Sequence, residues 1–250
     1  MKTKNALIGY TGFIGSNLLN FKKKFHKYNS KNINKIKNKQ YDLVICAGTS
    51  SKIWLAKKKP RLDFNKITYL INSLKKINAK KFVLISTCEI YGSHNNQKES
   101  SLKFSNKNYH YGYNRLMLEN FVKANFAKSF ILRLPIVYGK NFYKNCIYDL
   151  IYKNNIEKLN GNDRIQIYNV ANLKKHINFA LKYNISILNI SSRAIRLSWI
   201  AKKFFNVRLG KKKNFRNMKM QTIYGKSSSN YFLSSKKCIR DLKHFIKKNK

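Results

Sequence analysis

Three stretches of the chain combine residue types and spacing that could do chemistry. In the first, Gly9, Gly12 and Gly15 follow a short apolar run and precede Ser16-Asn17-Leu18-Leu19. A strand, a glycine turn and a helix in this order suit the pyrophosphate of a dinucleotide. The first glycine permits the tight turn, the second admits phosphates to backbone N–H groups, and the third lets the helix pack closely. The alternative is a plain strand–helix turn.

The second stretch is Ser86-Thr87-Cys88-Glu89-Ile90-Tyr91-Gly92, which leaves the end of an apolar run at 81–86. If that run is a strand of a parallel sheet, its carboxyl end lies at the edge where such sheets bind ligands. A hydroxyl there could hydrogen-bond a substrate carbonyl or alcohol. Glu89 is one of only nine acidic residues in the chain. The alternative is a Ser/Thr turn with a solvated glutamate.

The third stretch is Tyr111-Gly112-Tyr113-Asn114-Arg115, followed four residues later by Glu119. Residues four apart share one face of a helix, so Arg115 would lie one turn from Tyr111. A nearby cation can lower the pKa of a phenol from about 10 toward neutrality, which would make Tyr111 a usable general acid–base. The alternative is that Arg115 and Glu119 form an ordinary surface ion pair.

Alternating strands and helices would position these stretches. Strands are predicted at 5–8, near 27–28, and at 41–47, 81–86 and 129–134; helices are predicted from Pro60 to Leu74 and over 111–124. The strands are apolar throughout, which is typical of a parallel sheet covered on both faces. The pattern predicts an α/β fold, a Rossmann-type doubly wound parallel sheet.

The second half of the chain is less regular. Helices are predicted over 141–158, 197–205 and 236–248, and short strands over 165–168 and 187–190. We therefore predict a dinucleotide-binding domain at 1–140, completed by part of 165–190. Residues 141–250 would form a small C-terminal substrate lobe built onto it.

Composition narrows the function classes. The chain has 250 residues, is 43% hydrophobic and carries a formal charge of +44. Such a charge favours polyanions, but the lysines are spread along the whole chain, which is also typical of compositional bias at solvated positions. No apolar run reaches the roughly 18 residues that span a bilayer. The four cysteines stand alone, which argues against a disulfide framework and favours a reducing, cytoplasmic location. The five histidines have no metal-ligand spacing, which argues against a metal site.

Together these motifs resemble the extended short-chain dehydrogenase/reductases, the NAD(P)-dependent epimerase/dehydratase family. The resemblance is carried by five segments in the family's order. They are G-Y-T-G-F-I-G at 9–15, Y-D-L-V-I-C-A-G at 41–48, S-T-C-E-I-Y-G at 86–92, Y-G-Y-N-R at 111–115 and R-L-P-I-V-Y-G at 133–139.

The resemblance assigns roles to individual residues. Thr87 would polarise the substrate oxygen, Tyr111 would be the acid–base, and Arg115 stands where the family has a lysine that holds the nicotinamide ribose. The residues implied to bind the cofactor are Gly9, Thr11, Gly12, Phe13, Ile14, Gly15, Ser30, Ala47, Gly48, Ser86, Tyr111 and Arg115. Those implied to bind the substrate are Cys88, Glu89, Pro135 and Arg164.

Two departures from the family pattern refine the expectation. Cys88 stands where dehydratases have an acid, which favours a nucleotide-sugar epimerase or reductase. The segment after the second predicted strand lacks the acid that clamps the ribose of NAD and contains Ser30 and Lys31 instead, which favours NADP over NAD.

Two other function classes stay open. Because an arginine fork is not a point ammonium, Arg115 allows a catalytically weakened NAD(P)-binding sensor or scaffold. The charge allows a basic nucleic-acid-binding Rossmann protein, although the dispersed lysines do not favour it. The resemblance also implies a homodimer formed through a helix pair that includes 111–124.

Overall fold

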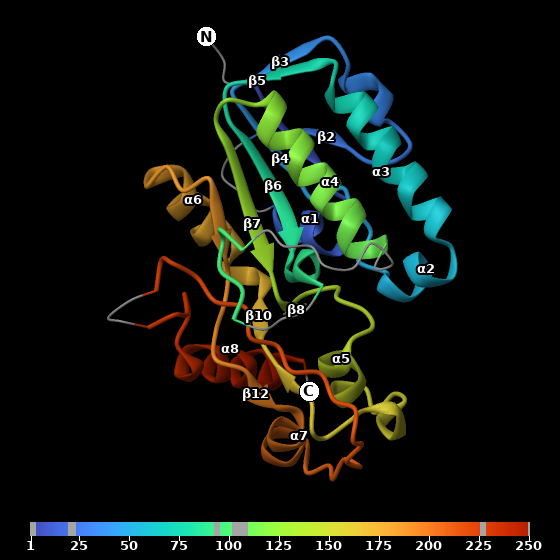
Figure 1. Ribbon diagram of the computed structural model, residues 1–250, viewed down its shortest axis with the longest axis vertical. Helices are drawn as coiled ribbons and strands as arrows, with labels where there is room; N and C mark the ends of the chain where they lie inside the picture. The colour runs from blue at the N-terminus through green and yellow to red at the C-terminus, as the bar shows by residue number, and fades with distance from the viewer. Residues whose placement is uncertain (1–3, 20–23, 93–95, 102–109, 226–228, 250) are drawn as a thin grey trace. The chain divides into compact units, whose positions relative to one another are not determined.

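The structure is a computed structural model that describes residues 4–19, 24–92, 96–101, 110–225 and 229–249 (Figure 1). The chain forms two compact units. The first comprises Met1–Ser93, Leu102–Arg133 and Asn172–Leu188, and the second comprises His94–Ser101, Leu134–Ala171 and Asn189–Lys250. The chain thus passes from one unit to the other several times.

A six-stranded parallel sheet organises the first unit, in the order β11-β7-β6-β4-β1-β2. The strands are β1 (Asn5–Ile8), β2 (His26–Tyr28), β4 (Leu43–Cys46), β6 (Phe82–Thr87), β7 (Ser129–Leu134) and β11 (Ile187–Asn189). The order steps outward from β1 in both directions, as in a doubly wound fold, so the predicted Rossmann-type sheet is confirmed.

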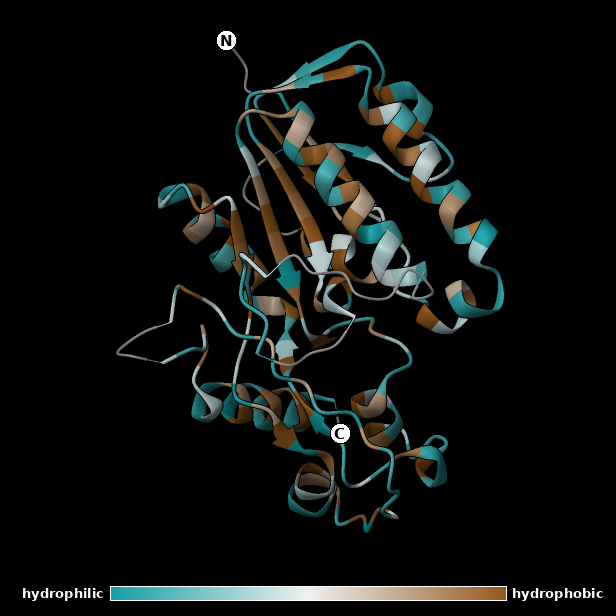
Figure 2. Ribbon diagram, viewed as in Figure 1, coloured by the Kyte–Doolittle hydropathy of each residue, from teal (hydrophilic) through white to brown (hydrophobic). Residues whose placement is uncertain are grey.

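The central strands form because their residues are apolar on both faces. All residues of β1 and β4 are buried, and Figure 2 shows apolar residues along the central strands. Since neighbouring side chains of a strand point to opposite faces, continuous burial means that both faces of the sheet are covered.

Among the residues that the structure describes, five α-helices belong to the first unit. They are α1 (Phe13–Asn17), α2 (Ile53–Lys58), α3 (Pro60–Leu74), α4 (His110–Asn125) and α6 (Leu173–Lys182), with short 3-10 helices η1 (Ile33–Ile36) and η2 (Cys88–Tyr91). Pro60 occupies the first turn of α3, where its missing N–H removes no hydrogen bond. Helix α4 packs beside α3 and against β6 (Figure 1). A two-stranded pair, β3 (Lys39–Tyr41) with β5 (Ile77–Ala79), completes this unit.

The second unit combines short strands and turns with two longer helices, α7 (Leu197–Phe205) and α8 (Ser235–Lys248). Its other elements are β8 (Ile136–Tyr138), α5 (Cys146–Ile151), η3 (Ile156–Lys158), β9 (Arg164–Ile165), β10 (Ile167–Asn169), η4 (Val170–Asn172) and β12 (Ile195–Arg196). Strand β8 pairs with β10, and β9 pairs with β12. Helix α8 is amphipathic and buries Cys238, Leu242 and Ile246, and its N-cap Ser234 accepts a hydrogen bond from the Lys237 N–H. No helix of the described chain is long and apolar enough to cross a membrane.

The predicted helix over 141–158 is wrong in extent. Only Cys146–Ile151 forms an α-helix, because left-handed backbone at Lys144 precedes it and left-handed residues at Lys153 and Asn155 follow it. These residues turn the chain before a second helical turn can form on either side. The strand predicted over 41–47 is divided between β3 and β4, because Tyr41 pairs with Ala79.

A buried carboxylate joins three distant segments of the second unit. Glu99 accepts hydrogen bonds from the Asn189 N–H at 2.9 Å, the Thr222 hydroxyl at 2.5 Å and the Ile223 N–H at 2.9 Å. Its side chain is buried, and each of these bonds offsets part of the cost of removing the charge from water.

Candidate active site

The glycine turn lies at the carboxyl end of β1, as the sequence predicts. Gly9 has a φ of +82°, and its N–H donates to the Tyr28 carbonyl at the end of β2. A Cβ on Gly9 would overlap the carbonyl group of Ala47, and a Cβ on Gly15 would overlap the backbone of Gly9. Glycine is therefore sterically required at both positions.

The next residues of the turn lead into α1. Gly12 is its N-cap residue and places no side chain over the first turn. Thr11 is exposed, whereas Phe13 and Ile14 are half-buried. Bare backbone at the start of a helix is the arrangement that phosphate groups can approach.

Other predicted cofactor residues follow the neighbouring strands at the same edge of the sheet. Ala47 and Gly48 follow β4, and the Ala47 N–H donates to the Ile8 carbonyl at 2.9 Å. Ser30 and Lys31 follow β2 and are exposed, in a turn that Asn29 stabilises through its side chain. Because β2, β1 and β4 are adjacent and parallel, these residues share the carboxyl edge with the glycine turn.

Tyr111 and Arg115 face each other on the first turns of α4. The guanidinium carbon of Arg115 lies 3.9 Å from the centroid of the Tyr111 ring, a cation–π geometry. Both side chains are buried. The predicted one-turn spacing is therefore confirmed as a direct stacking contact.

The effect on Tyr111 differs from the prediction. Burial raises the pKa of Tyr111 to about 12, because desolvation of the phenolate outweighs the lowering by Arg115. Glu89, Asp63 and Cys88 raise the pKa further, since each is or becomes a negative charge near the phenol.

Arg115 is held by residues outside its own helix. One terminal nitrogen donates to the carboxylate of Asp63 on α3, and the other donates to the Ser50 carbonyl at 2.6 Å. Asn114 donates to the same Asp63 oxygen at 2.8 Å. The alternative of a surface ion pair between Arg115 and Glu119 is wrong, because both are buried and have other partners.

Glu119 instead pairs with Arg133 on β7. The shortest of their contacts joins the Arg133 Nη2 to the Glu119 Oε2 at 2.7 Å, and both side chains are fully buried. Ser86 donates its hydroxyl to Glu119 at 2.5 Å, and Arg133 donates to the Tyr91 hydroxyl at 2.7 Å. The predicted cofactor residue Ser86 thus has its hydroxyl engaged within the protein.

The stretch after β6 forms η2. The Thr87 hydroxyl accepts a hydrogen bond from the Glu89 N–H at 3.2 Å and caps this short helix. Thr87 is half-buried, and Cys88 and Glu89 are buried. The alternative of a solvated Glu89 is therefore wrong, whereas the Ser/Thr turn is confirmed.

Two predicted substrate residues belong to the second unit. Pro135 is buried between β7 and β8, and Arg164 is an exposed residue of β9. The Arg164 N–H donates to the Arg216 carbonyl at 2.8 Å, so its backbone is anchored while its side chain reaches solvent.

A model of the NAD-dependent epimerase/dehydratase family matches residues 6–179. The chain belongs to this family. No curated protein matches the chain in sequence.

Solved structures of family type share the fold at low identity. MoeE5 in complex with UDP-glucose and NAD is 14% identical, with a TM-score of 0.73 and 98% and 99% of the two chains covered. A dTDP-4-dehydrorhamnose reductase from Bacillus anthracis in complex with NADP is 19% identical, with a TM-score of 0.64 and 87% and 84% covered. A UDP-N-acetylglucosamine 4-epimerase from Methanobrevibacter ruminantium is 14% identical, with a TM-score of 0.69 and 99% and 98% covered.

The first unit of this family member fits a nicotinamide dinucleotide at the carboxyl edge of its sheet. The close approach of Gly9 and Gly15 to neighbouring backbone and the bare N-cap at Gly12 leave main chain, rather than side chains, facing the helix start. The guanidinium of Arg115 carries a buried Nε without a hydrogen-bond partner, a donor near Tyr111 that a ligand hydroxyl could satisfy.

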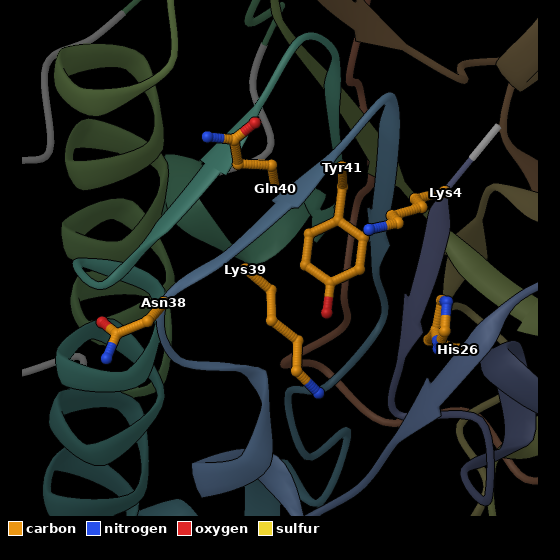
Figure 3. A pocket seen from close by; sticks show the side chains of 6 residues that line it. All are labelled: Lys4, His26, Asn38, Lys39, Gln40 and Tyr41. Carbon is orange, nitrogen blue, oxygen red and sulfur yellow. The ribbon is translucent and has the colours of Figure 1, made fainter. Parts of the chain in front are cut away.

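A pocket of about 410 Å³ lies elsewhere in the same unit (Figure 3). It is lined by Lys4, His26, Asn38, Lys39, Gln40 and Tyr41. Lys4 and His26 stand at the amino ends of β1 and β2, so this pocket lies at the edge of the sheet opposite the glycine turn. None of the predicted site residues lines it.

Sequence reasoning missed the partners of Arg115. Asp63 and Ser50 lie far from Arg115 in sequence, and their contacts with its guanidinium depend on how α3 and α4 pack together. One signal was available: acids are scarce in this chain, and Asp63 lies in the first turn of a predictable helix.

Proposed function

We propose that this member of the epimerase/dehydratase family is an NAD(P)-dependent nucleotide-sugar epimerase or reductase. The observation that supports it best is the stacking of Arg115 on Tyr111 in the unit that also carries the glycine turn. An acid–base phenol beside a fixed cation and a dinucleotide turn suits hydride-transfer chemistry.

The cofactor would lie along the carboxyl edge. The turn from Gly9 to Gly15 would hold the pyrophosphate, and Arg115 would hold the nicotinamide ribose. Ser30 and Lys31 are exposed beyond β2 and would accept a 2′-phosphate, so NADP is the proposed cofactor in preference to NAD. When bound, the nicotinamide supplies or accepts a hydride at a sugar carbon.

This chain's own residues would manage the proton. Thr87 would polarise the substrate oxygen through its hydroxyl, and Tyr111 would exchange a proton with that oxygen at Oη. Cys88 and Glu89 would line the sugar site. A dehydratase is not proposed, because the buried thiol of Cys88 stands where elimination needs an acid.

Residues 141–250 are proposed as a substrate lobe and 1–140 as the dinucleotide-binding domain, completed by part of 165–190. Pro135 and Arg164 would contact the nucleotide sugar, with the exposed Arg164 suited to phosphate. A cytoplasmic location is proposed because the cysteines, all free, suit a reducing compartment.

A homodimer is proposed through α3 and α4. Leu62, Tyr69 and Tyr113 on these helices are large apolar side chains with 40% or more of their surface exposed. Exposed aromatic side chains on adjacent helices are typical of protein interfaces.

A second function is an NAD(P)-binding sensor or scaffold without turnover. The ion pair between Arg115 and Asp63 favours this function, because the charge of Arg115, which catalysis would use, is already compensated. Nucleic-acid binding is the third function considered, and only the net charge of +44 supports it.

Calorimetric titration with NADP(H) and NAD(H), at physiological and at high salt, tests the proposal. We expect saturable binding that persists at high salt, because a backbone cradle depends little on screened surface charge. Gly12→Val should lose at least tenfold in affinity, since a branched side chain at the N-cap would fill the approach to the first turn. Exposed Gly210→Val is the matched control, because a Cβ there meets no atom within 4 Å.

The outcomes separate the three functions. Turnover of UDP- or dTDP-sugars that is lost in Tyr111→Phe supports the enzyme, and binding without turnover supports the sensor. Absent cofactor binding, or binding that disappears with salt, would contradict both. In that case the polyanion reading gains support.

A further inference from the structure

The Arg115 side chain is clamped rather than free to move. Its two terminal nitrogens are taken by the Asp63 carboxylate and the Ser50 carbonyl, and its plane stacks on Tyr111. Arg115 is 2% exposed and Asp63 is 7% exposed, so water screens this pair poorly. Asn114 donates to Asp63 from the same turn of α4, which fixes the carboxylate as well.

We propose that Asp63 is a positioning residue of this site, which takes up the charge of Arg115 and so leaves Tyr111 a proton donor. The inference rests on the proposed function, in which Tyr111 exchanges a proton with the substrate. It adds a protonation state: the resting site holds Tyr111 as the neutral phenol, the form that can give a proton to a carbonyl oxygen of an oxidised sugar.

The charges around Tyr111 support this protonation state. On α4 the neighbouring cation is Arg115, and it is neutralised by Asp63 from α3. From η2, Glu89 and Cys88 add an acid and a thiol. The lysines of α2, Lys57 and Lys58, and the cations of α3, Arg61 and Lys66, are exposed, as is His110 on α4.

Burial of the phenol acts in the same direction as the acids, since it disfavours the charged phenolate. With the arginine charge compensated, the phenol keeps its proton at neutral pH. In the proposed step Tyr111 would give its proton to the carbonyl oxygen, a bound reduced nicotinamide would supply the hydride to the carbonyl carbon, and the phenolate would regain a proton from water.

Tyrosine titration by NMR tests the proposal without substrate or cofactor. Tyrosines labelled with ¹³C at the ring carbon that bears the hydroxyl report ionisation directly, and Tyr111→Phe identifies the Tyr111 signal. We expect wild-type Tyr111 to stay protonated up to about pH 10, the ordinary pKa of tyrosine. In Asp63→Asn, Arg115 loses its compensating charge, and the Tyr111 midpoint should fall by one pH unit or more, roughly the effect of one nearby charge.

Two further variants distinguish an effect of the Asp63 charge from a purely structural effect of the substitution. Asp63→Asn with Arg115→Gln removes both charges and should return the Tyr111 midpoint toward the wild-type value. Asp42→Asn removes an acid from an ion pair with Lys80 and should leave the Tyr111 signal unchanged. A merely structural role for Asp63 would not produce this reversal.

The proposal is overturned if wild-type Tyr111 ionises below about pH 9, a full unit under the ordinary pKa. It is equally overturned if Asp63→Asn titrates like the wild type. The first criterion needs only the Tyr111→Phe assignment, so it holds even if Asp63→Asn does not fold. Calorimetry with NADP(H) and NAD(H) tests the proposed function separately, because the titration of Tyr111 does not require cofactor binding.

Discussion

Among the residues that the structure describes, Arg133 carries the largest side chain that is fully buried. Glu119, Ser86 and Tyr91 surround its guanidinium and the paired carboxylate with hydrogen bonds. Removing two charges from water is costly, and only a completely satisfied network makes such a pair tolerable. The pair therefore links β6, η2, α4 and β7.

Glu119→Ala should destabilise the protein strongly, because it leaves the Arg133 charge buried and unpaired. We expect a loss of about 3–5 kcal/mol in the free energy of unfolding, measured by urea denaturation. Asp42→Ala breaks the more exposed pair with Lys80 and should cost no more than about 1 kcal/mol. Equal losses in the two variants would contradict this account.

Local spacing in the sequence was sufficient to predict on which elements the candidate site residues lie. The glycine turn, Thr87 and the pair Tyr111 and Arg115 all occur on the elements expected for them. Asp63 was not predicted as a partner of Arg115, because helix packing sets that contact across 52 positions of sequence. The proton affinity of Tyr111 was predicted in the wrong direction, since burial cannot be read from spacing alone.

At the scale of elements, the segments that could be predicted are those with one dominant sequence signal, such as a continuous apolar run or a proline at a helix start. Continuous apolar runs gave β1, β6 and β7, and Pro60 marked the start of α3. Helix α6 was missed although it buries Leu173 and Ile177, because its lysines and asparagines resemble the polar loops around it. Paired strands such as β3 and β5 are three residues long, too short for a periodic pattern.

The N-cap of α5 explains where that short helix begins. The Asn145 side-chain oxygen accepts from the N–H groups of Ile147 and Tyr148, and its amide donates to the Val137 carbonyl at 2.8 Å. Asn145→Ala should lower stability by about 1 kcal/mol or somewhat more, measured by thermal denaturation. Lys59→Ala is the control, because Lys59 is an N-cap residue whose side chain makes no capping bond. A change within about 0.5 kcal/mol is expected there.

At the scale of the whole molecule, the formal net charge is +44. Of the nine acids, Asp63, Glu89, Glu99 and Glu119 are buried, so few negative charges remain to offset 53 lysines and arginines. Repulsion among exposed cations destabilises the compact state, and this repulsion is screened by salt.

Thermal stability should therefore rise with ionic strength. Between about 20 mM and about 500 mM sodium chloride, where the Debye length shrinks several-fold, we expect an increase of several degrees in Tm by calorimetry. The control is a neutral solute at the same osmolality, which tests whether the rise in Tm comes from exclusion of the solute from the protein surface rather than from charge screening. A Tm that falls as salt is added would mean that attractive pairs outweigh the lysine repulsion.

The carboxylate of Glu99 has a consequence for the order in which the protein folds during synthesis. Its hydrogen-bond partners lie 90, 123 and 124 residues further along the chain. The first unit is complete once Leu188 has been made, whereas Glu99 waits for Ile223. Units whose contacts span long stretches of sequence fold late. The ribosome must therefore release the chain as far as Ile223 before the second unit can close around this residue.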